Sequence, residues 1–231
     1  PYLFREKTVL RIPNYTIHYC GKNNRSLIAV PSHLKTFLIT NISDKDTTAV
    51  LLEEDFLVNS TSTNPKKYIL VSSYLDILDK KVISQGLERC SSFAKRNQIP
   101  LILGIDSNAH STLWGCDNNN HRGEILEEWI IEQSLSIVNI GSTATFVTRR
   151  ANSIIDITLV SDDVIDNVTN WRVNKQYQFS DHRRLEFYLK YSARRTIFSR
   201  NFRKADWGLF RATLGKNRKW TPPFSWNIKV L

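Results

Sequence analysis

The feature that most constrains the fold is a strand, a helix and a second strand that follow one another between residues 67 and 105. Residues 67–74 form a β-prone, largely apolar run. A helix is predicted over residues 80–97, which carry apolar residues at helical spacing, namely Ile83, Leu87, Cys90 and Ala94. Pro100 ends this helix, and Leu101–Ile105 is a nearly all-apolar strand of the kind found inside a sheet. This order indicates a crossover unit between two strands of one sheet.

Short β-prone runs lie on both sides of this unit. Those before it are separated only by turn-rich segments, so we expect antiparallel strands at 16–20, 26–30, 37–40 and 47–53. After it, a second amphipathic helix is predicted at 123–134, followed by strands at 136–140, 144–147, 154–160, 168–173 and 185–190. Helices interspersed among many strands predict an α/β fold in which a two-layer sheet sandwich is flanked by helices.

Composition limits the class of protein. The 231 residues are 41% hydrophobic and 23% charged, which is close to the average of soluble globular domains. No apolar run approaches the roughly 18 residues that a membrane span needs, so we expect no membrane partner. The three cysteines are an odd number without CxxC spacing, which argues against a disulfide framework and a structural zinc site.

The net charge of +10 is unevenly distributed. Residues 1–189 contain 21 basic and 21 acidic side chains, whereas residues 190–231 contain eleven basic side chains and only Asp206 as an acid. We therefore expect one domain over 1–191 and a basic linker over 192–231, which either connects domains or contacts nucleic acid. Because the chain has no methionine and begins with Pro1, we also expect it to be a segment of a longer reading frame.

Three short motifs carry residues suited to catalysis. Asp106 and Asn108 follow an apolar strand, where they could bind a hard cation or orient a water, or simply form an Asx turn. Asp156 lies in an apolar strand and needs a partner such as a histidine, unless it faces solvent on an edge strand. Ser180–His182 offers an imidazole beside a carboxylate, although such a triplet is also common on surfaces.

The order of these motifs is more specific than any one of them. Tyr74 at a strand end, the Asp-x-Asn motif, Thr145-Phe146, Asp156 and Ser-Asp-His together resemble the endonuclease/exonuclease/phosphatase superfamily, to which DNase I and the apurinic endonucleases belong. The stretches GIDSNAHSTLWG, TATFVTRRANSIIDITLVS and FSDHRRLEF resemble more closely the endonuclease domain of insect non-LTR retrotransposons of the R1/TRAS type. The resemblance covers roughly residues 1–191.

The resemblance implies a fold and a set of roles. The fold would be a four-layered α/β sandwich, with two packed, mostly antiparallel sheets between helices. His182 would act as the base or stabilise the transition state, and Asp156 would orient it. Asp106 and Asn108 would position the water and the scissile phosphate. The remaining roles would be metal binding by Asp181, a phosphate hydrogen bond from Tyr74 and a DNA contact by Thr145. Arg149, Arg150 and Arg183 flank the proposed site on loops, where they either contact DNA phosphates or are solvated charges.

The resemblance also implies an activity, namely Mg²⁺- or Mn²⁺-dependent nicking of target DNA that leaves a 3′ hydroxyl for reverse transcription. We would then expect a nuclear protein that binds DNA, needs no small-molecule cofactor and forms part of a polyprotein with a reverse transcriptase. Two alternatives stay open, which are a phosphomonoesterase of the same fold and a truncated remnant that binds nucleic acid without cutting it.

One departure from the family pattern affects the metal site. The family's principal metal ligand is a glutamate in a Gln-Glu-Pro-Tyr motif, and the chain opens at Pro1-Tyr2 of that motif. The glutamate is therefore expected just upstream of Pro1, together with the first strand of the sheet. We expect the 231 residues alone to be nearly inactive and less stable than a longer form.

Overall fold

The computed structural model describes residues 11–54, 66–176, 180–190 and 228–229. Its α-helices are α1 (Gln85–Asn97) and α2 (His121–Glu132), and its short 3-10 helices are η1 (Thr112–Trp114) and η2 (Asp162–Asn167). Its strands are β1 (Tyr15–His18), β2 (Ile28–Pro31), β3 (Lys35–Leu38), β4 (Thr47–Glu54), β5 (Lys66–Tyr74), β6 (Leu101–Asp106), β7 (Leu135–Ile137), β8 (Phe146–Val147), β9 (Asn152–Ser153), β10 (Asp156–Ser161), β11 (Val168–Val173), β12 (Leu185–Leu189) and β13 (Ile228–Lys229).

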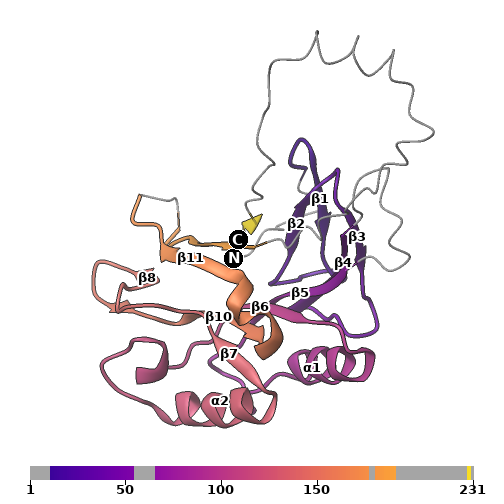
Figure 1. Ribbon diagram of the computed structural model, residues 1–231. Helices are drawn as coiled ribbons and strands as arrows, with labels where there is room; N and C mark the ends of the chain where they lie inside the picture. Colours follow the sequence, from indigo (N-terminus) through magenta and orange to yellow (C-terminus); the bar gives the residue numbers. More distant parts are fainter. Residues whose placement is uncertain (1–10, 55–65, 177–179, 191–227, 230–231) are drawn as a thin grey trace, which may run out of the picture.

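A six-stranded sheet with the order β3-β4-β5-β6-β10-β7 forms the centre of the fold (Figure 1). β5 and β6 pair in parallel, and α1 joins them, which confirms the crossover unit that the sequence predicts. The other neighbours in this sheet are antiparallel, and for β3 and β4 this agrees with the expectation from their short connection. β1 and β2 pair separately as an antiparallel ribbon.

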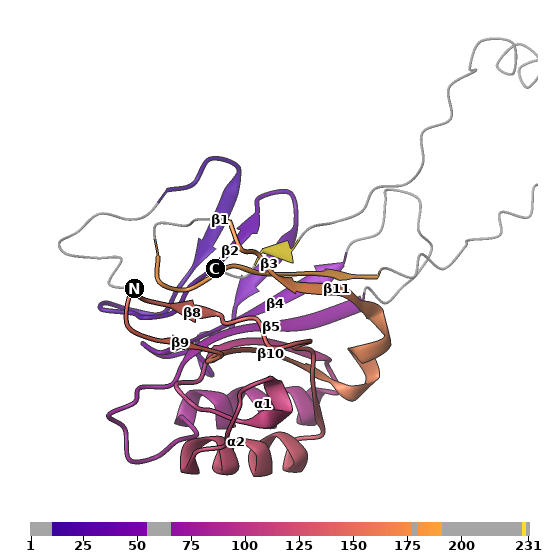
Figure 2. The ribbon, with the colours of Figure 1, turned by 90° about the vertical axis from the view of Figure 1, so that its left-hand side faces the viewer.

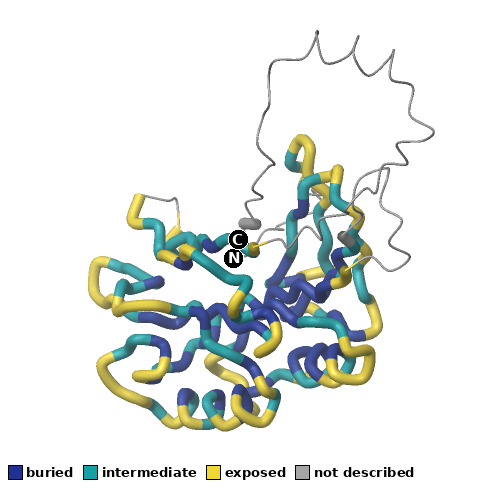
Figure 3. Tube along the Cα trace, viewed as in Figure 1, coloured by how far each residue is buried: buried dark blue, intermediate teal, exposed yellow. Residues whose placement is uncertain are grey.

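The central sheet is covered on both faces. α1 and α2 lie under one face, and the sheet β11-β12-β13 lies over the other (Figure 2). The strands supply side chains to each side in alternation: Ile69 and Leu103 belong to the core shared with the helices, whereas Leu70 and Ile102 belong to the core shared with Trp171 of the second sheet. This alternation explains the near-continuous apolar runs. The buried residues concentrate along the middle of the molecule (Figure 3).

These layers confirm an α/β sandwich. Within the described residues, both α-helices lie on the same face of the six-stranded sheet. Neither of these helices has the length and apolar character required to cross a membrane. Most of the basic segment 192–231 lies outside the described residues, so its predicted role as a linker stays a prediction. Its described part, β13, pairs with β12.

Several element boundaries differ from the sequence-based expectation: α2, expected over 123–134, spans 121–132, and the strand expected over 136–140 ends at Ile137. Two further differences have a clear local cause. The first helix begins at Gln85 rather than near residue 80, because Ser84 is its N-cap and accepts a hydrogen bond from the amide of Leu87 (3.1 Å). The strand predicted over 154–160 begins at Asp156, since the two preceding residues connect it to the β8–β9 hairpin. No local pattern indicates η2, which is a short 3-10 helix of mixed polar and apolar residues.

The central position of β6 leads to a stability prediction. Leu103 is fully buried in the core between the sheet and the helices. We expect Leu103→Ala to lower the free energy of unfolding by about 2–5 kcal/mol, because it leaves a cavity in a packed core. Ile131→Ala is the matched control, since this side chain is 73% exposed and its removal should change stability by about 0.5 kcal/mol or less. Urea denaturation followed by circular dichroism measures both, and equal effects would contradict the assignment of this core.

Candidate active site

Three strands bring the predicted site residues to one edge of the central sheet. Asp106 is the last residue of β6 and Asp156 the first of β10, and the antiparallel register places them directly opposite each other. Tyr74 is the last residue of β5 and pairs with Asp106 on its other side. All three occupy strand positions on the face that packs against the second sheet. The β8–β9 hairpin lies at the same end of β10 (Figure 2).

His182 reaches this edge from the segment that precedes β12. Its Nδ1 donates hydrogen bonds to both oxygens of Asp156, at 2.9 and 3.0 Å. Its backbone pairs with Phe146 of β8, whose ring meets the imidazole edge-on at a centroid distance of 4.9 Å. The structure therefore brings Asp156 and His182 together as expected. The edge-strand alternative does not describe Asp156, because β10 lies between β6 and β7.

The backbone around Asp156 is held by buried polar side chains. The hydroxyl of Thr145 accepts hydrogen bonds from the amides of Ile155 (3.1 Å) and Asp156 (3.0 Å). The amide of Asn139 donates to the carbonyl of Asp156 at 3.1 Å. Thr145 is fully buried, so the DNA contact expected for it does not fit this structure, in which it fixes the start of β10. The sequence offered no signal for the role of Asn139.

Asp106 has an unusual electrostatic environment. Its pKa is raised from 3.8 to about 6, first because burial disfavours the charged form, and second because the carboxylate of Asp156 lies nearby, while His182 acts in the opposite direction. Its Oδ2 lies 3.7 Å from Nε2 of His182. Its buried Oδ1 accepts no hydrogen bond within the described residues. A buried carboxylate oxygen of this kind is suited to a cation or an ordered water.

The imidazole of His182 is tuned toward its protonated form. The hydrogen bond to Asp156 raises its pKa above the ordinary 6.5, and the charges of Asp156 and Asp106 add to this effect, although partial burial opposes it. The pair therefore combines an imidazole oriented through one nitrogen with a second nitrogen that faces Asp106.

The residues at this edge fit a divalent cation. Asp106, Asp156 and His182 each offer one ligand atom, and these atoms lie within 4.8 Å of one another. Carboxylate oxygens are preferred by Mg²⁺ and Mn²⁺, and the Oδ1 of Asp106 has no hydrogen-bond partner among the described residues, so it has capacity for a cation. Asp181 is exposed and does not belong to this cluster, although its backbone carbonyl accepts a hydrogen bond from Val147 (2.8 Å). Its predicted metal role stays a prediction.

Asn108 and Tyr74 are positioned by contacts distant in sequence. Asn108 adopts a left-handed backbone (φ 47°), and its side-chain amide donates to the carbonyl of Leu75 at 3.0 Å.

The guanidinium of Arg25 lies over the ring of Tyr74, 4.5 Å from its centroid, and also binds the carboxylates of Asp46 and Asp76. Sequence reasoning missed Arg25, because its partners lie 21 and 51 residues along the chain and no local motif links them.

The other predicted DNA contacts lie around the same edge. Arg149 and Arg150 are exposed in the turn between β8 and β9. Arg183 is half-buried, and its guanidinium donates to the carbonyl of Ala144 at 3.2 Å. Arg149 and Arg150 are therefore available to a ligand in solution, whereas Arg183 also supports the loop.

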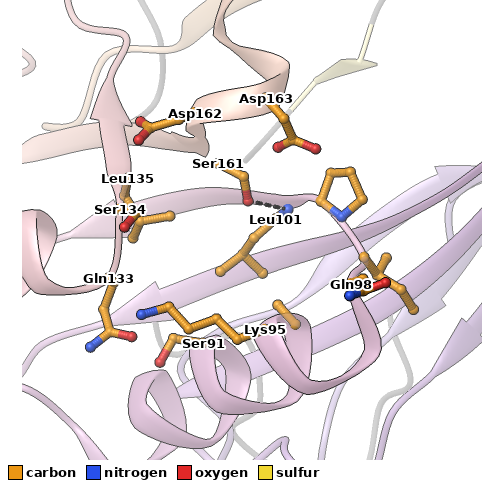
Figure 4. A pocket seen from close by; sticks show the side chains of 13 residues that line it. Ser91, Lys95, Gln98, Leu101, Gln133, Ser134, Leu135, Ser161, Asp162 and Asp163 are labelled. Atoms are coloured by element: carbon orange, nitrogen blue, oxygen red, sulfur yellow. Dashed lines mark hydrogen bonds between the residues drawn. The ribbon is translucent and has the colours of Figure 1, made fainter.

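A cavity of about 410 Å³ lies at the opposite ends of these strands. It is lined by residues around the first position of β6 and the last of β10, where the amide of Leu101 donates to the hydroxyl of Ser161 at 2.8 Å (Figure 4). Asp106 and Asp156 occupy the other ends of β6 and β10, so this cavity is distinct from the cluster.

The Asp156–His182 pair predicts a pH dependence in metal-free buffer. The pKa of His182 is higher in the folded protein than in the unfolded chain, where it is about 6.5, so protonation of His182 stabilises the fold. This contribution to the free energy of unfolding is fully present below about pH 6.5 and is lost as the pH rises through the pKa of His182 in the folded protein. In Asp156→Asn, the NMR titration of His182 should move to lower pH and this pH-dependent change in stability should shrink. Asp163→Asn, at an exposed acid, is the control. An unchanged His182 titration in Asp156→Asn would contradict the pairing.

Comparisons with known proteins agree with this geometry. A sequence profile described as endonuclease-reverse transcriptase matches residues 68–186, just over half of the chain. The chain is 32% identical over 131 residues to a putative 115 kDa protein in the type-1 retrotransposable element R1DM of Drosophila melanogaster, a match that covers 50% of the chain and 13% of that protein. It is 34% identical over 91 residues to a retrovirus-related Pol polyprotein from the element R1 of Bradysia coprophila, covering 36% of the chain and 9% of that protein.

A solved structure shares most of the fold. The endonuclease domain of TRAS1, a telomere-specific non-LTR retrotransposon, superposes with a TM-score of 0.64 and 25% identity, over 83% of this chain and 84% of that domain. The matched profile runs from within β5 to the start of β12, and this stretch contains all three residues of the Asp106–Asp156–His182 cluster. The chain therefore belongs to the endonuclease-reverse transcriptase family, and it has the fold of the retrotransposon endonucleases of the endonuclease/exonuclease/phosphatase superfamily.

Proposed function

We propose that this chain is a metal-dependent DNA endonuclease, which nicks target DNA and leaves a 3′ hydroxyl that primes reverse transcription. The observation that carries the proposal is the cluster of Asp106, Asp156 and His182 at the strand ends of a nuclease fold. The much greater lengths of the two retrotransposon relatives support a longer polyprotein as its natural context. We propose that it acts in the nucleus, where chromosomal target DNA is found.

The chemistry follows from the hydrogen bond between His182 and Asp156. Because Nδ1–H donates to Asp156, Nε2 of the neutral ring is free to accept a proton from water. That water attacks phosphorus, a new P–O bond forms, and the bond from phosphorus to the 3′ oxygen breaks. The 3′ oxygen takes up a proton and becomes the hydroxyl, while the phosphate stays on the 5′ side of the next nucleotide. Asp156 orients the ring and stabilises the imidazolium that forms.

Asp106 and Asn108 would hold the reacting groups in place. A bound Mg²⁺ or Mn²⁺ would supply positive charge for the oxyanion that develops on the phosphate. Asp106 would bind it through the buried Oδ1 that is otherwise unpartnered within the described residues. Asn108 and Tyr74 lie beside Asp106 and would direct an amide and a phenol toward the phosphate. The exposed Arg149 and Arg150 would contact flanking phosphates.

The proposal predicts the activity of a His182 variant. Assays would use a form of the chain extended by a Gln-Glu dipeptide before Pro1-Tyr2, because the family resemblance expects a metal-binding glutamate at that position of the motif. This protein should nick supercoiled plasmid in Mg²⁺ and stop in EDTA. His182→Ala should reduce the rate by about a hundredfold or more, the usual scale for a general base. His33→Ala, at an exposed histidine between β2 and β3, is the control.

The pH profile and a second substrate separate the alternatives. The nicking rate should rise with pH through the raised pKa of His182, because the neutral ring is the base. A His182→Ala variant that nicks at the parent rate would remove this residue from the mechanism. Rapid hydrolysis of p-nitrophenyl phosphate without nicking would instead favour the phosphomonoesterase, and DNA binding without hydrolysis of either substrate would favour the non-catalytic remnant.

A further inference from the structure

Two adjacent aliphatic side chains protrude from the segment between β5 and α1. Ile77 is 60% exposed and Leu78 is 87% exposed. They are the two central residues of a turn in which the amide of Asp79 donates to the carbonyl of Asp76 at 3.2 Å. Central turn positions are usually occupied by glycine, proline, asparagine, aspartate or serine. Two large apolar side chains that are mostly exposed there add little to the core, so their presence needs a different explanation.

The turn is held in place from two sides. The guanidinium of Arg25 binds the carboxylate of Asp76, which also accepts a hydrogen bond from the amide of Leu78 at 3.0 Å. The guanidinium of Arg122, at the start of α2, donates to the carbonyls of Asp76 (3.2 Å) and Asp79 (3.3 Å). The apolar tip is therefore presented to solvent by a fixed support.

The turn also begins directly beside the catalytic cluster. The buried Leu75 precedes it, and the amide of Leu75 donates to the carbonyl of Asp106 at 2.9 Å. The side chain of Asn108 donates to the carbonyl of the same Leu75. The turn therefore begins one residue after Leu75, whose backbone bonds both to Asp106 and to Asn108.

Several basic side chains lie near the tip, together with the exposed Asp79 that ends the turn. Lys80 and Lys81 follow it and are exposed, and Lys45 lies close enough to influence Asp76. Arg122 contacts only carbonyl oxygens here, and within the described residues its Nε has no partner and no carboxylate neutralises it. The carboxylate of Asp76 is neutralised by Arg25. An apolar tip with Lys80, Lys81 and Arg122 beside it is complementary to duplex DNA, which is a polyanion with a stacked, apolar interior.

We propose that Ile77 and Leu78 form an apolar wedge that enters a groove of duplex DNA beside the cleaved phosphodiester and unstacks a base step. Lys80, Lys81 and Arg122 contact the phosphates on either side of the wedge. This inference rests on the proposed nuclease function and adds a determinant of DNA geometry to it. A wedge uses binding energy to open a base step, so sites that unstack easily are preferred.

The test measures unstacking without cleavage. In a His182→Ala background, the protein is mixed with short duplexes that carry 2-aminopurine at successive positions, since this base fluoresces when it leaves the stack. The parent should raise the fluorescence at one position. Ile77→Ala/Leu78→Ala should abolish this rise and weaken binding by about tenfold or less, because the cost of unstacking disappears together with the apolar contacts. Leu78→Met, which keeps an apolar tip, should retain the rise.

Matched controls separate the wedge from folding and from other surfaces. Ile131→Ala removes a similarly exposed aliphatic side chain from the last turn of α2 and should leave the fluorescence unchanged. The Tm of Ile77→Ala/Leu78→Ala should equal that of the parent, because both side chains are exposed. Replacing Lys80 and Lys81 by Gln should flatten the dependence of log affinity on log salt by about 0.9 for each phosphate that is no longer neutralised.

The outcomes of this experiment distinguish the wedge from the nuclease function. Binding with the same fluorescence rise in parent and Ile77→Ala/Leu78→Ala would overturn the wedge and leave the proposed function intact. No binding to duplex DNA would overturn both. Two other outcomes would also overturn the wedge. If Ile77→Ala/Leu78→Ala converted a dimer into a monomer, the tip would be assigned to contact with a second copy. If it weakened binding to anionic vesicles and left DNA binding unchanged, the tip would be assigned to a membrane surface.

Discussion

The antiparallel register of β6 and β10 is the constraint on which the rest of the site depends. It sets Asp106 against Asp156 at the edge of the sheet, where two carboxylates would repel each other and one is largely buried. Such an arrangement costs folding free energy unless a positive charge lies between or beside the carboxylates. His182 provides part of this compensation through Asp156. The Oδ1 of Asp106, which has no hydrogen-bond partner in the described part of the chain, can accept a further positive charge.

The register is fixed by the two cores on either face of the central sheet. Ile157 and Leu159 point toward the helices, whereas Val160 packs toward the second sheet, together with Thr158, whose hydroxyl accepts a hydrogen bond from the indole of Trp171 (3.1 Å). A slip of one residue would turn every side chain of β10 to the other face. The cost of exposing both apolar sets therefore keeps Asp156 on the face where the segment before β12 brings His182.

A second network connects the N-terminal strands to the same edge. Arg25 precedes β2 and reaches the carboxylate of Asp46 before β4, the ring of Tyr74 at the end of β5, and Asp76 in the turn that follows. One guanidinium thus sets the position of a proposed phosphate contact and of the apolar turn. Because charge-assisted hydrogen bonds to two partly buried carboxylates are strong and directional, this network can hold a loop rigid without a local hydrophobic core.

The sequence by itself determined the element types, because apolar periodicity and turn residues act locally: the crossover from β5 through α1 to β6 and the amphipathic α2 follow from it. The motif order also indicated Asp106, Asp156 and His182, through a family resemblance and not through spacing. Only the tertiary structure decided that Asp156 is paired and not solvated, that Thr145 is buried behind it, and that Arg25 and Arg122 support an apolar turn. These contacts join residues between 10 and 51 positions apart, and their formation depends on sheet register and on the packing of layers, which no local pattern encodes.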